Sequence, residues 1–317
     1  MEAEAAGAAQ PLAVAAVSPA GGHALAARGV REWLRLLRVH QYVKNALVFV
    51  PLLTAHAFTP SAFVTCLLAA LAFSLCASAT YIFNDLVDIE ADRAHPTKRT
   101  RPLAAGTIST RQAIMVAPVL VVVAFTIAAA TSAHVTALLL LYMVLTTAYS
   151  LWLKRQVLLD VVVLSVFYTL RVVVGAVAID VVLSEWLLAF SFLIFTSLAL
   201  VKRYSELSTR VAAKLGNPEN RDYAIEDLSI VGAMAAASGF NAITLFALYV
   251  SSDTVRSLYA RPWVLWLICP VLMYWIARAL VLAHRRKMHD DPIVFALKDK
   301  VSLASLAVIV ALTLAAI

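Results

Sequence analysis

The sequence predicts an all-α membrane protein whose helices cross the bilayer nine times. Of its 317 residues, 62% are apolar and only 14% are charged, whereas soluble domains contain about 45 to 50% apolar and about 25% charged residues. The apolar residues gather in runs of about twenty, the length that spans a bilayer core of about 30 Å. This pattern excludes a soluble globule, a disordered chain and a disulfide-stapled scaffold.

The chain divides into a short tail and one membrane domain. Residues 1–27 are rich in alanine and carry Glu2 and Glu4 instead of the basic start of a signal peptide, so we expect a disordered cytoplasmic tail. Residues 28–317 hold all the apolar runs, of which the first and the sixth are the shortest. The predicted spans are centred near Val50, Ala70, Val121, Leu141, Val166, Phe192, Leu245, Leu272 and Ile309.

Charged residues mark the ends of these spans, from the first to the ninth. The first span starts at Lys44 and the second ends in an acidic segment that begins at Asp85. The third and fourth lie between that segment and Lys154, and the fifth and sixth lie between Lys154 and Lys202. The seventh and eighth follow, and a charged segment that ends at Lys300 precedes the ninth.

The basic residues fall on one side of this predicted topology. The chain carries 26 lysine and arginine residues and a formal net charge of +7. All of them flank the N-terminus or the loops after even-numbered spans, except Arg171 inside the fifth span and Arg256 and Arg261 on the opposite side. Because basic loops stay on the cytoplasmic face, we expect the N-terminus and these loops in the cytoplasm and the protein in a bacterial-type inner membrane. Nucleic-acid binding is not expected, since no basic stripe is interleaved with aromatic residues.

Acidic residues are concentrated at the end of the second span. Asp85, Asp88 and Asp92 are spaced i, i+3, i+7, which on a helix puts their carboxylates on one stripe, with Asn84 adjacent. Like charges so close repel each other, so the cluster indicates a shared divalent cation. Mg²⁺ is held by one or two carboxylates together with substrate phosphates and water. We therefore expect these four residues to bind Mg²⁺ and a diphosphate; the alternative is a solvated, acidic helix end.

Basic residues follow this acidic segment directly. Lys98, Arg99 and Arg101 are placed to bind the outer oxygens of the same diphosphate. The alternative is that they are ordinary cytoplasmic anchors.

The order of residues from Asn84 to Leu103 narrows these alternatives. It reads N-D-x-x-D-x-x-x-D followed by K-R-x-R-P-L, which resembles the first motif of the UbiA superfamily of intramembrane prenyltransferases. The resemblance extends over roughly residues 30–317. It implies nine helices, Mg²⁺ as cofactor, and a diphosphate bound between two Asp-rich motifs, whose carbon–oxygen bond breaks toward a cation that a nucleophile captures. Further matching segments are Lys44-Asn45, Tyr149 to Lys154, and Asp160 with Arg171.

The second motif departs from the family pattern. Lys202, Arg203 and Glu206 stand where ordinary members carry the second Asp-rich motif, and this K-R-Y-x-E-L segment resembles the branch that includes decaprenyl-phosphate phosphoribosyltransferase. In that branch the donor is phosphoribosyl pyrophosphate and the nucleophile is a polyprenyl phosphate. The donor's ribose carries a second phosphate on C5, for which Lys202 and a bidentate Arg203 are suitable ligands. Alternatively, Lys202 pairs with Glu206 at i, i+4 in an anchor worth only about 0.3 to 0.5 kcal/mol.

Two basic residues lie within or at the mouth of spans. Lys44 at the mouth of the first span is either a phosphate ligand or a snorkelling anchor. Arg171 lies deep in the fifth span, where a charge costs at least about 2.5 kcal/mol, so it should face a polar cavity or an acid such as Asp160 or Asp85. The segment Asp290–Asp299 resembles a D-D-P-x-x-F-A-L-x-D segment of the same branch, and a solvated loop is the favoured interpretation.

These residues favour phosphoribosyl transfer to a polyprenyl, decaprenyl-type phosphate for cell-envelope glycolipid precursors. Asp85, Asp88, Asp92 and Asn84 would hold Mg²⁺ on the pyrophosphate, and the lipid phosphate, ionised near pH 7, would attack without a strong general base. An aromatic prenyltransferase with a polyprenyl diphosphate donor is the first alternative, and a transporter or lipid flippase is the second. The expected partners are the lipid substrate, the anionic donor and membrane lipid, with a homo-oligomer left open.

Overall fold

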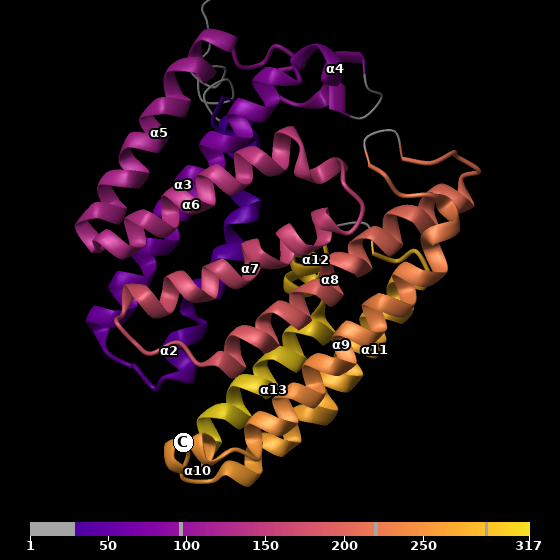
Figure 1. The fold of residues 1–317 in the computed structure, drawn as a ribbon. Helices are drawn as coiled ribbons and strands as arrows, with labels where there is room; N and C mark the ends of the chain where they lie inside the picture. The colour runs from indigo at the N-terminus through magenta and orange to yellow at the C-terminus, as the bar shows by residue number, and fades with distance from the viewer. Residues whose placement is uncertain (1–28, 95–97, 219–220, 289–290) are drawn as a thin grey trace, which may run out of the picture.

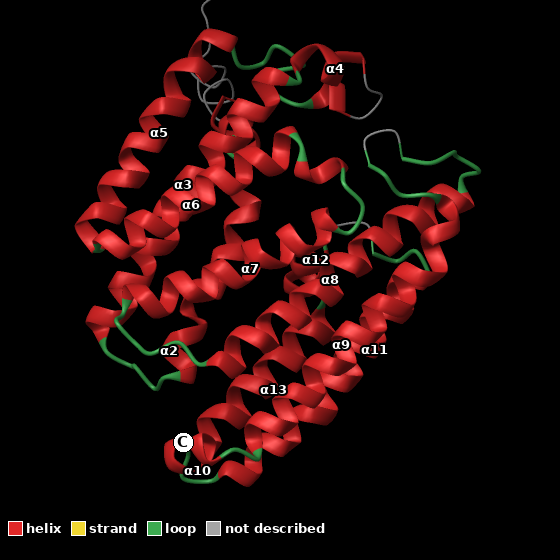
Figure 2. Ribbon diagram, in the orientation of Figure 1, coloured by secondary structure: helices red, strands yellow, loops and turns green. Residues whose placement is uncertain are grey.

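The computed structural model describes residues 29–94, 98–218, 221–288 and 291–317. Within these ranges the chain forms helices joined by loops and contains no strand, as Figure 2 shows. The all-α prediction is therefore confirmed for this part of the chain. The predicted tail, residues 1–27, and Asp290 lie outside the described residues.

Seven helices in the described ranges are long and apolar enough to cross a membrane. They coincide with the second to the eighth predicted spans, so the chain is a multi-pass membrane protein. The seven are α3 (Pro60–Val87), α5 (Thr110–Thr131), α6 (Ala133–Leu151), α7 (Leu159–Ala178), α8 (Glu185–Ala212), α9 (Leu228–Val250) with η4 (Ile225–Asp227), and α11 (Ile268–His284) with η5 (Pro262–Leu267).

The first and the ninth predicted spans are shorter than expected. At the first position, a 3₁₀ helix η1 (Val39–Phe49) leads into α2 (Val50–Thr54). Pro51 in the first turn of α2 has no N–H to extend a preceding helix, so the chain starts a new one there. The ninth position holds α13 (Lys300–Ala316). The count of nine spans stays a prediction.

Side-chain caps define where several helices begin. Ser109 and Gln112 form a reciprocal capping box at the start of α5. Ser132, Ser184 and Asp299 each accept a hydrogen bond from a first-turn N–H of α6, α8 and α13. These contacts satisfy donors that a helix end leaves without partners. Shorter helices occupy the connections: α4 (Ile89–Ala94), η2 (Lys98–Thr100), η3 (Leu153–Arg155), α10 (Asp253–Leu258) and α12 (Pro292–Lys298).

Helix α7 joins two halves of the bundle. Figure 1 shows α3, α5 and α6 on one side of it and α8, α9, α11 and α13 on the other. Phe167 of α7 packs into the core of the first half, and Tyr168 and Val172 pack into the core of the second. Gly175 allows η1 to approach closely, because a Cβ there would lie 2.0 Å from the carbonyl oxygen of Val48. The position of η1 therefore depends on α7.

The loops that were predicted to share one side of the membrane meet at one end of the bundle. The N–H of Asp222 donates to the carbonyl of Arg155 at 3.1 Å and links the loops after the fourth and sixth spans. Arg38, before the first span, pairs with Asp85 at the end of the second. Figure 1 shows α4 at this end and α10 with the C-terminus at the other. The orientation of these ends relative to the cytoplasm stays a prediction.

Candidate active site

Two buried carboxylates from consecutive helices share one arginine. Asp85 in the last turn of α3 and Asp92 in α4 are only 3% and 2% exposed. The Nη1 atom of Arg101 lies 3.2 Å from Asp85 Oδ1 and 2.6 Å from Asp92 Oδ2. Arg38 Nη2 lies 2.7 Å from the same Asp85 oxygen, and its guanidinium lies 4.5 Å from the ring centre of Tyr81. We call Asp85 and Asp92 the acidic pair; two arginines offset the repulsion between these carboxylates.

The other two residues of the first motif differ from the acidic pair in their surroundings. Helix α3 ends immediately before Asp88, which is its C-cap, and α4 begins immediately after it. The predicted continuous helix is therefore interrupted at the middle carboxylate, although the N–H of Asp88 still donates to the carbonyl of Asn84 at 3.0 Å and the N–H of Asp92 to that of Asp88 at 2.8 Å. The side-chain amide of Asn84 donates to Ser150 Oγ at 2.9 Å. The structure thus brings together Asp85 and Asp92 but directs Asn84 toward α6.

A group of cations lies around Lys154, together with Asp88. Burial lowers the pKa of Lys154, the charge of Asp88 opposes this, and the charges of Arg155, Arg221 and Lys98 lower it further. We call Lys98, Lys154, Arg155 and Arg221 the η3 cation group. Lys98 also lies 3.9 Å from Asp92 and Arg221 lies 3.0 Å from Asp160, so only part of this positive charge is available to attract an anion.

Two further predicted ligands lie at the margin of this group. Arg99 is exposed on η2. The ring of Tyr149 packs edge-on against Phe167, with ring centres 5.7 Å apart, and Tyr149 also interacts with Arg221. Both residues therefore remain near the cations without joining the acidic pair.

The acidic pair has the donor chemistry of a magnesium site. Oxygen atoms of Asp85 and Asp92 already converge on one positive group, the Nη1 atom of Arg101. Mg²⁺ requires only one or two carboxylates when phosphates and water complete its shell, so Asp85 and Asp92 would hold it. The ion would supply neutralisation of diphosphate charge. Among the described residues, no three acidic, histidine or cysteine side chains converge, so the predicted set of Asp85, Asp88, Asp92 and Asn84 is not assembled here.

A second charged cluster links three distant parts of the chain. Asp291 Oδ2 lies 3.1 Å from Lys44 Nζ and 3.0 Å from Lys202 Nζ, and the hydroxyl of Tyr168 donates to both carboxylate oxygens at 3.2 and 3.3 Å. Burial alone would raise the pKa of Asp291, but the two ammonium groups outweigh burial and hold this pKa well below its usual range. We call Lys44, Lys202 and Asp291 the lysine–carboxylate cluster; its carboxylate is ionised at neutral pH.

Arg203, next to Lys202, belongs to a separate buried network. Its side chain is 1% exposed, with Nε 2.8 Å from Asp160 Oδ2 and Nη1 in contact with Glu206. Arg221 Nη1 also lies 3.0 Å from Asp160 Oδ2. The basic pair expected to form one phosphate site is therefore split between two clusters. The alternative pairing of Lys202 with Glu206 is also wrong, because Lys202 pairs with Asp291 and Glu206 pairs with Arg203.

Arg171 is buried inside α7 and has no acidic partner among the residues that the structure describes. Its Nε donates to Asn45 Oδ1 at 2.8 Å, its Nη1 donates to a backbone carbonyl one turn earlier, and its guanidinium lies 5.3 Å from the ring centre of Tyr142. The predicted pairing with Asp160 or Asp85 is therefore wrong. An amide, a carbonyl and an aromatic ring disperse the charge instead, and Arg171 holds η1 in place beside Lys44.

An apolar cavity of about 930 Å³ lies between η1, α2, α7, α8, α11 and α13. Leu47, Val50, Phe195, Leu272 and Ile309 are among its lining residues. Cavities of this kind accommodate apolar ligands of a few hundred to about a thousand Å³.

Sequence reasoning did not select Arg38 or Asp291 as site residues. The partners of Asp291, Lys44 and Lys202, lie 247 and 89 residues away along the chain, and no short spacing reveals such contacts. The signal available was the resemblance of the D-D-P segment to the corresponding segment of one family branch. Its interpretation as a solvated loop is wrong for Asp291, which is largely buried.

Comparisons with known proteins agree with this architecture. The UbiA prenyltransferase family matches residues 46–306. The uncharacterized protein y4nM of Sinorhizobium fredii is 39% identical over 86% of this chain, which spans about half (53%) of that relative's length. Nodulation protein NoeC of Azorhizobium caulinodans is 34% identical, covering 84% of this chain and 87% of NoeC. Decaprenyl-phosphate phosphoribosyltransferase of Corynebacterium glutamicum is 32% identical, covering 73% of this chain and 70% of that enzyme.

Solved structures share the fold. A UbiA homolog from Archaeoglobus fulgidus bound to GPP and Mg²⁺ superposes with a TM-score of 0.63 at 16% identity, covering 89% of this chain and 99% of that one. A UbiA homolog from Aeropyrum pernix gives a TM-score of 0.56 at 20% identity, with coverages of 90% and 97%. Together with the sequence match, these similarities identify the chain as a member of the UbiA prenyltransferase family of membrane transferases.

Proposed function

We propose that this protein transfers a phosphoribosyl group from phosphoribosyl pyrophosphate to a polyprenyl, decaprenyl-type phosphate and releases pyrophosphate. One observation carries the proposal: an acidic pair bordered by cations lies at one end of the bundle, and an apolar cavity that extends from the opposite end reaches Val43 and Leu198, next to Lys44 and Lys202. Such a site suits one water-soluble polyanion and one amphiphile. The relatives named as decaprenyl-phosphate phosphoribosyltransferases support this pair of substrates.

The donor would occupy the acidic pair and the cations beside it. Asp85 and Asp92 would hold Mg²⁺ on the pyrophosphate, with Arg101 and Arg38 beside them. A pair of unit charges about 4 Å apart gains about 1 to 4 kcal/mol at effective dielectric constants of 80 to 20, so a polyanion needs several cations. The η3 cation group, with Arg99 nearby, would bind the phosphate on ribose C5. This group replaces Lys202 and Arg203 in that role, because Arg203 is fully buried against Asp160 and Glu206, whereas Lys154 is half-buried and Arg155 is exposed on η3 after α6.

The reaction requires charge stabilisation more than proton transfer. As the bond between ribose C1 and pyrophosphate breaks, positive charge develops on the ribose and negative charge on the leaving group. An oxygen of the lipid phosphate, already ionised near pH 7, attacks C1 without a strong general base. Arginines and lysines fixed around the leaving group stabilise the negative charge, and the buried site holds both reactants in position.

Aromatic prenyl transfer is the second candidate. It is favoured by the fold relatives that were solved with GPP and with DMAPP, both allylic diphosphates. In this alternative a polyprenyl diphosphate is the donor, a phenolic or quinone precursor is the acceptor, and the acidic pair binds the diphosphate.

Product formation by purified protein separates these candidates. One reaction contains radiolabelled phosphoribosyl pyrophosphate, polyprenyl phosphate and Mg²⁺; the other contains radiolabelled 4-hydroxybenzoate, polyprenyl diphosphate and Mg²⁺. We expect label in the lipid extract of the first reaction only, with loss of transfer in Asp92→Asn. Product in the second reaction only would support the prenyltransferase. Lipid binding without turnover in either reaction would support a transporter or flippase. Phosphoribosyl transfer would also require this end of the bundle to face the cytoplasm, where the water-soluble donor is made. The protein would then lie in an inner membrane.

A further inference from the structure

The lysine–carboxylate cluster lies at one end of the apolar cavity. Val43 of η1 and Leu198 of α8 line the cavity. Lys44 directly follows Val43, and Lys202 lies one turn beyond Leu198 on the same face of α8. Helix α12, which begins immediately after Asp291, also contributes to the lining. The two ammonium groups therefore lie where the hydrocarbon lining of the cavity gives way to polar side chains.

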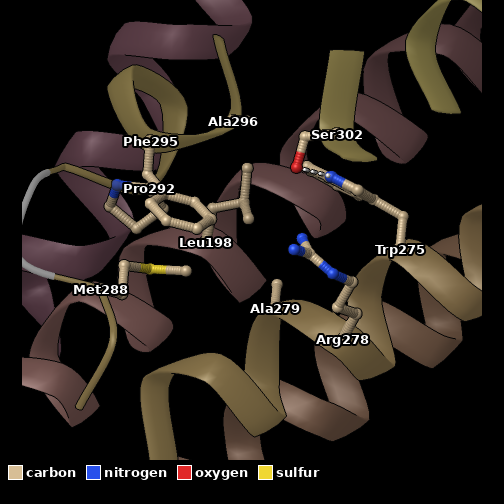
Figure 3. Close-up of a pocket in the computed structure, with 9 residues that line it drawn as sticks. All are labelled: Leu198, Trp275, Arg278, Ala279, Met288, Pro292, Phe295, Ala296 and Ser302. Carbon is tan, nitrogen blue, oxygen red and sulfur yellow. Dashed lines mark hydrogen bonds between the residues drawn. The ribbon is translucent and has the colours of Figure 1, made fainter. Parts of the chain in front are cut away.

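Helix α12 is fixed at both ends. Figure 3 shows Phe295 of α12 directed toward Leu198 of α8 and toward Met288, which places the start of α12 against the helix that carries Lys202. At the other end, Asp299 accepts two hydrogen bonds from Arg278, at 2.6 and 3.0 Å. These contacts hold the Asp291 carboxylate between the two lysines without any ligand.

The lysine–carboxylate cluster can bind an additional anion. An ammonium group has three N–H donors, and each lysine gives one to Asp291. Two lysines and one carboxylate leave one net positive charge. This combination of positive charge and free donors at the end of an apolar cavity matches an amphiphile whose head is a single phosphate group.

We propose that Lys44 and Lys202 bind the phosphate of the lipid acceptor, and that Asp291 positions these lysines and restricts the site to a monophosphate. The assignment rests on the proposed function, because it places the acceptor of that reaction. A lipid diphosphate carries more negative charge than the one net positive charge of the cluster can offset and would lie against the ionised Asp291, whereas a monophosphate brings less negative charge close to that carboxylate. Asp291 is thus a positioning and specificity residue.

Direct lipid binding tests the two lysines. Purified protein in nanodiscs is titrated with polyprenyl phosphate and with the polyprenol of the same length, with no donor present. We expect Lys44→Met and Lys202→Met each to weaken binding of the phosphate lipid by at least about tenfold and to leave polyprenol binding unchanged. Lys202→Arg should restore part of the loss. The matched control is Lys287→Met, because Lys287 is exposed on the loop before α12, and it should bind like wild type. Unchanged affinity in both lysine variants would overturn the assignment.

Titration with a third lipid, polyprenyl diphosphate, tests the proposed specificity role of Asp291. In Asp291→Asn, the affinity for polyprenyl diphosphate relative to polyprenyl phosphate should rise by at least about tenfold, because the repelling charge is gone. An equal loss for both lipids, or an unchanged ratio, would contradict the specificity role and leave Asp291 with a structural one. The titrations contain no donor, so their failure is independent of phosphoribosyl transfer. Conversely, absent transfer with an intact preference for the monophosphate would reject the proposed function and retain the lipid site.

Discussion

Gly175→Ala probes the contact that positions η1 and, through it, Lys44. A Cβ at residue 175 would lie 2.0 Å from the carbonyl oxygen and 2.8 Å from the carbonyl carbon of Val48. Restoring an ordinary contact requires a separation of roughly 1.4 Å more. Both groups are backbone-fixed, and Val48 is fully buried, so η1 must move as a unit. Overpacking typically costs about 1 to 3 kcal/mol, and we expect the upper end of this range. A displacement of about 1 Å at reacting groups lowers rates roughly a hundredfold.

Melting temperature and turnover of the purified variant measure these two effects. A loss of about 3 kcal/mol corresponds to a fall of several degrees in a chain of this size, with turnover reduced roughly a hundredfold. Gly232→Ala is the matched control, because its Cβ would meet the Tyr204 ring at 2.8 Å, and a half-buried side chain can move aside. A Gly175→Ala protein with wild-type melting and turnover would refute the close packing of η1 on α7.

Three other predictions follow from the charged clusters. Asp92→Asn should lower Mg²⁺-dependent turnover by at least about a hundredfold, and full activity of this variant would exclude the acidic pair as the metal site. Asp88→Asn should keep a near-wild-type melting temperature. Arg203→Met should lower unfolding stability by about 3 to 5 kcal/mol, because it leaves the fully buried Asp160 less compensated, and a selective rise in donor KM with intact melting would contradict this structural role. The depressed pKa of Asp291 means that its stabilising charge is complete above the ordinary carboxyl pKa of about 4 and is lost as pH falls through the lower folded value. The melting difference between wild type and Asp291→Asn should therefore be equal at pH 6 and pH 5, where its partner Lys44 is charged as well, and a difference that shrinks by pH 5 would disprove it.

The sequence predicts a membrane-spanning helix correctly where a long apolar run is sufficient to specify it. The second to the eighth spans depend on long apolar runs, and the structure has helices at all seven positions. The first position differs because Pro51 interrupts it and η1 winds as a 3₁₀ helix. A hydropathy pattern does not register this difference, since it counts apolar residues and not backbone hydrogen bonds.

The candidate site was predictable only where its residues are neighbours in sequence. The acidic segment and Arg101 lie within twenty residues of one another, and their spacing indicated shared anion and metal chemistry. The expected regular helix through Asp88 failed, because α3 ends there. The pairings of Arg171, Arg203 and Asp291 depend on how α7, α8 and α12 pack, which no single segment of sequence encodes.

The central claim is that phosphoribosyl pyrophosphate and a polyprenyl phosphate react in one site. The most direct test is mass spectrometry of the lipid fraction after purified protein is incubated with both substrates and Mg²⁺, with released pyrophosphate measured in parallel. We predict a lipid heavier by one phosphoribosyl group, equimolar pyrophosphate, and no product when Mg²⁺ is chelated or when Asp85→Asn replaces the wild type. An unchanged lipid mass, in protein that consumes a polyprenyl diphosphate with an aromatic acceptor, would contradict the claim.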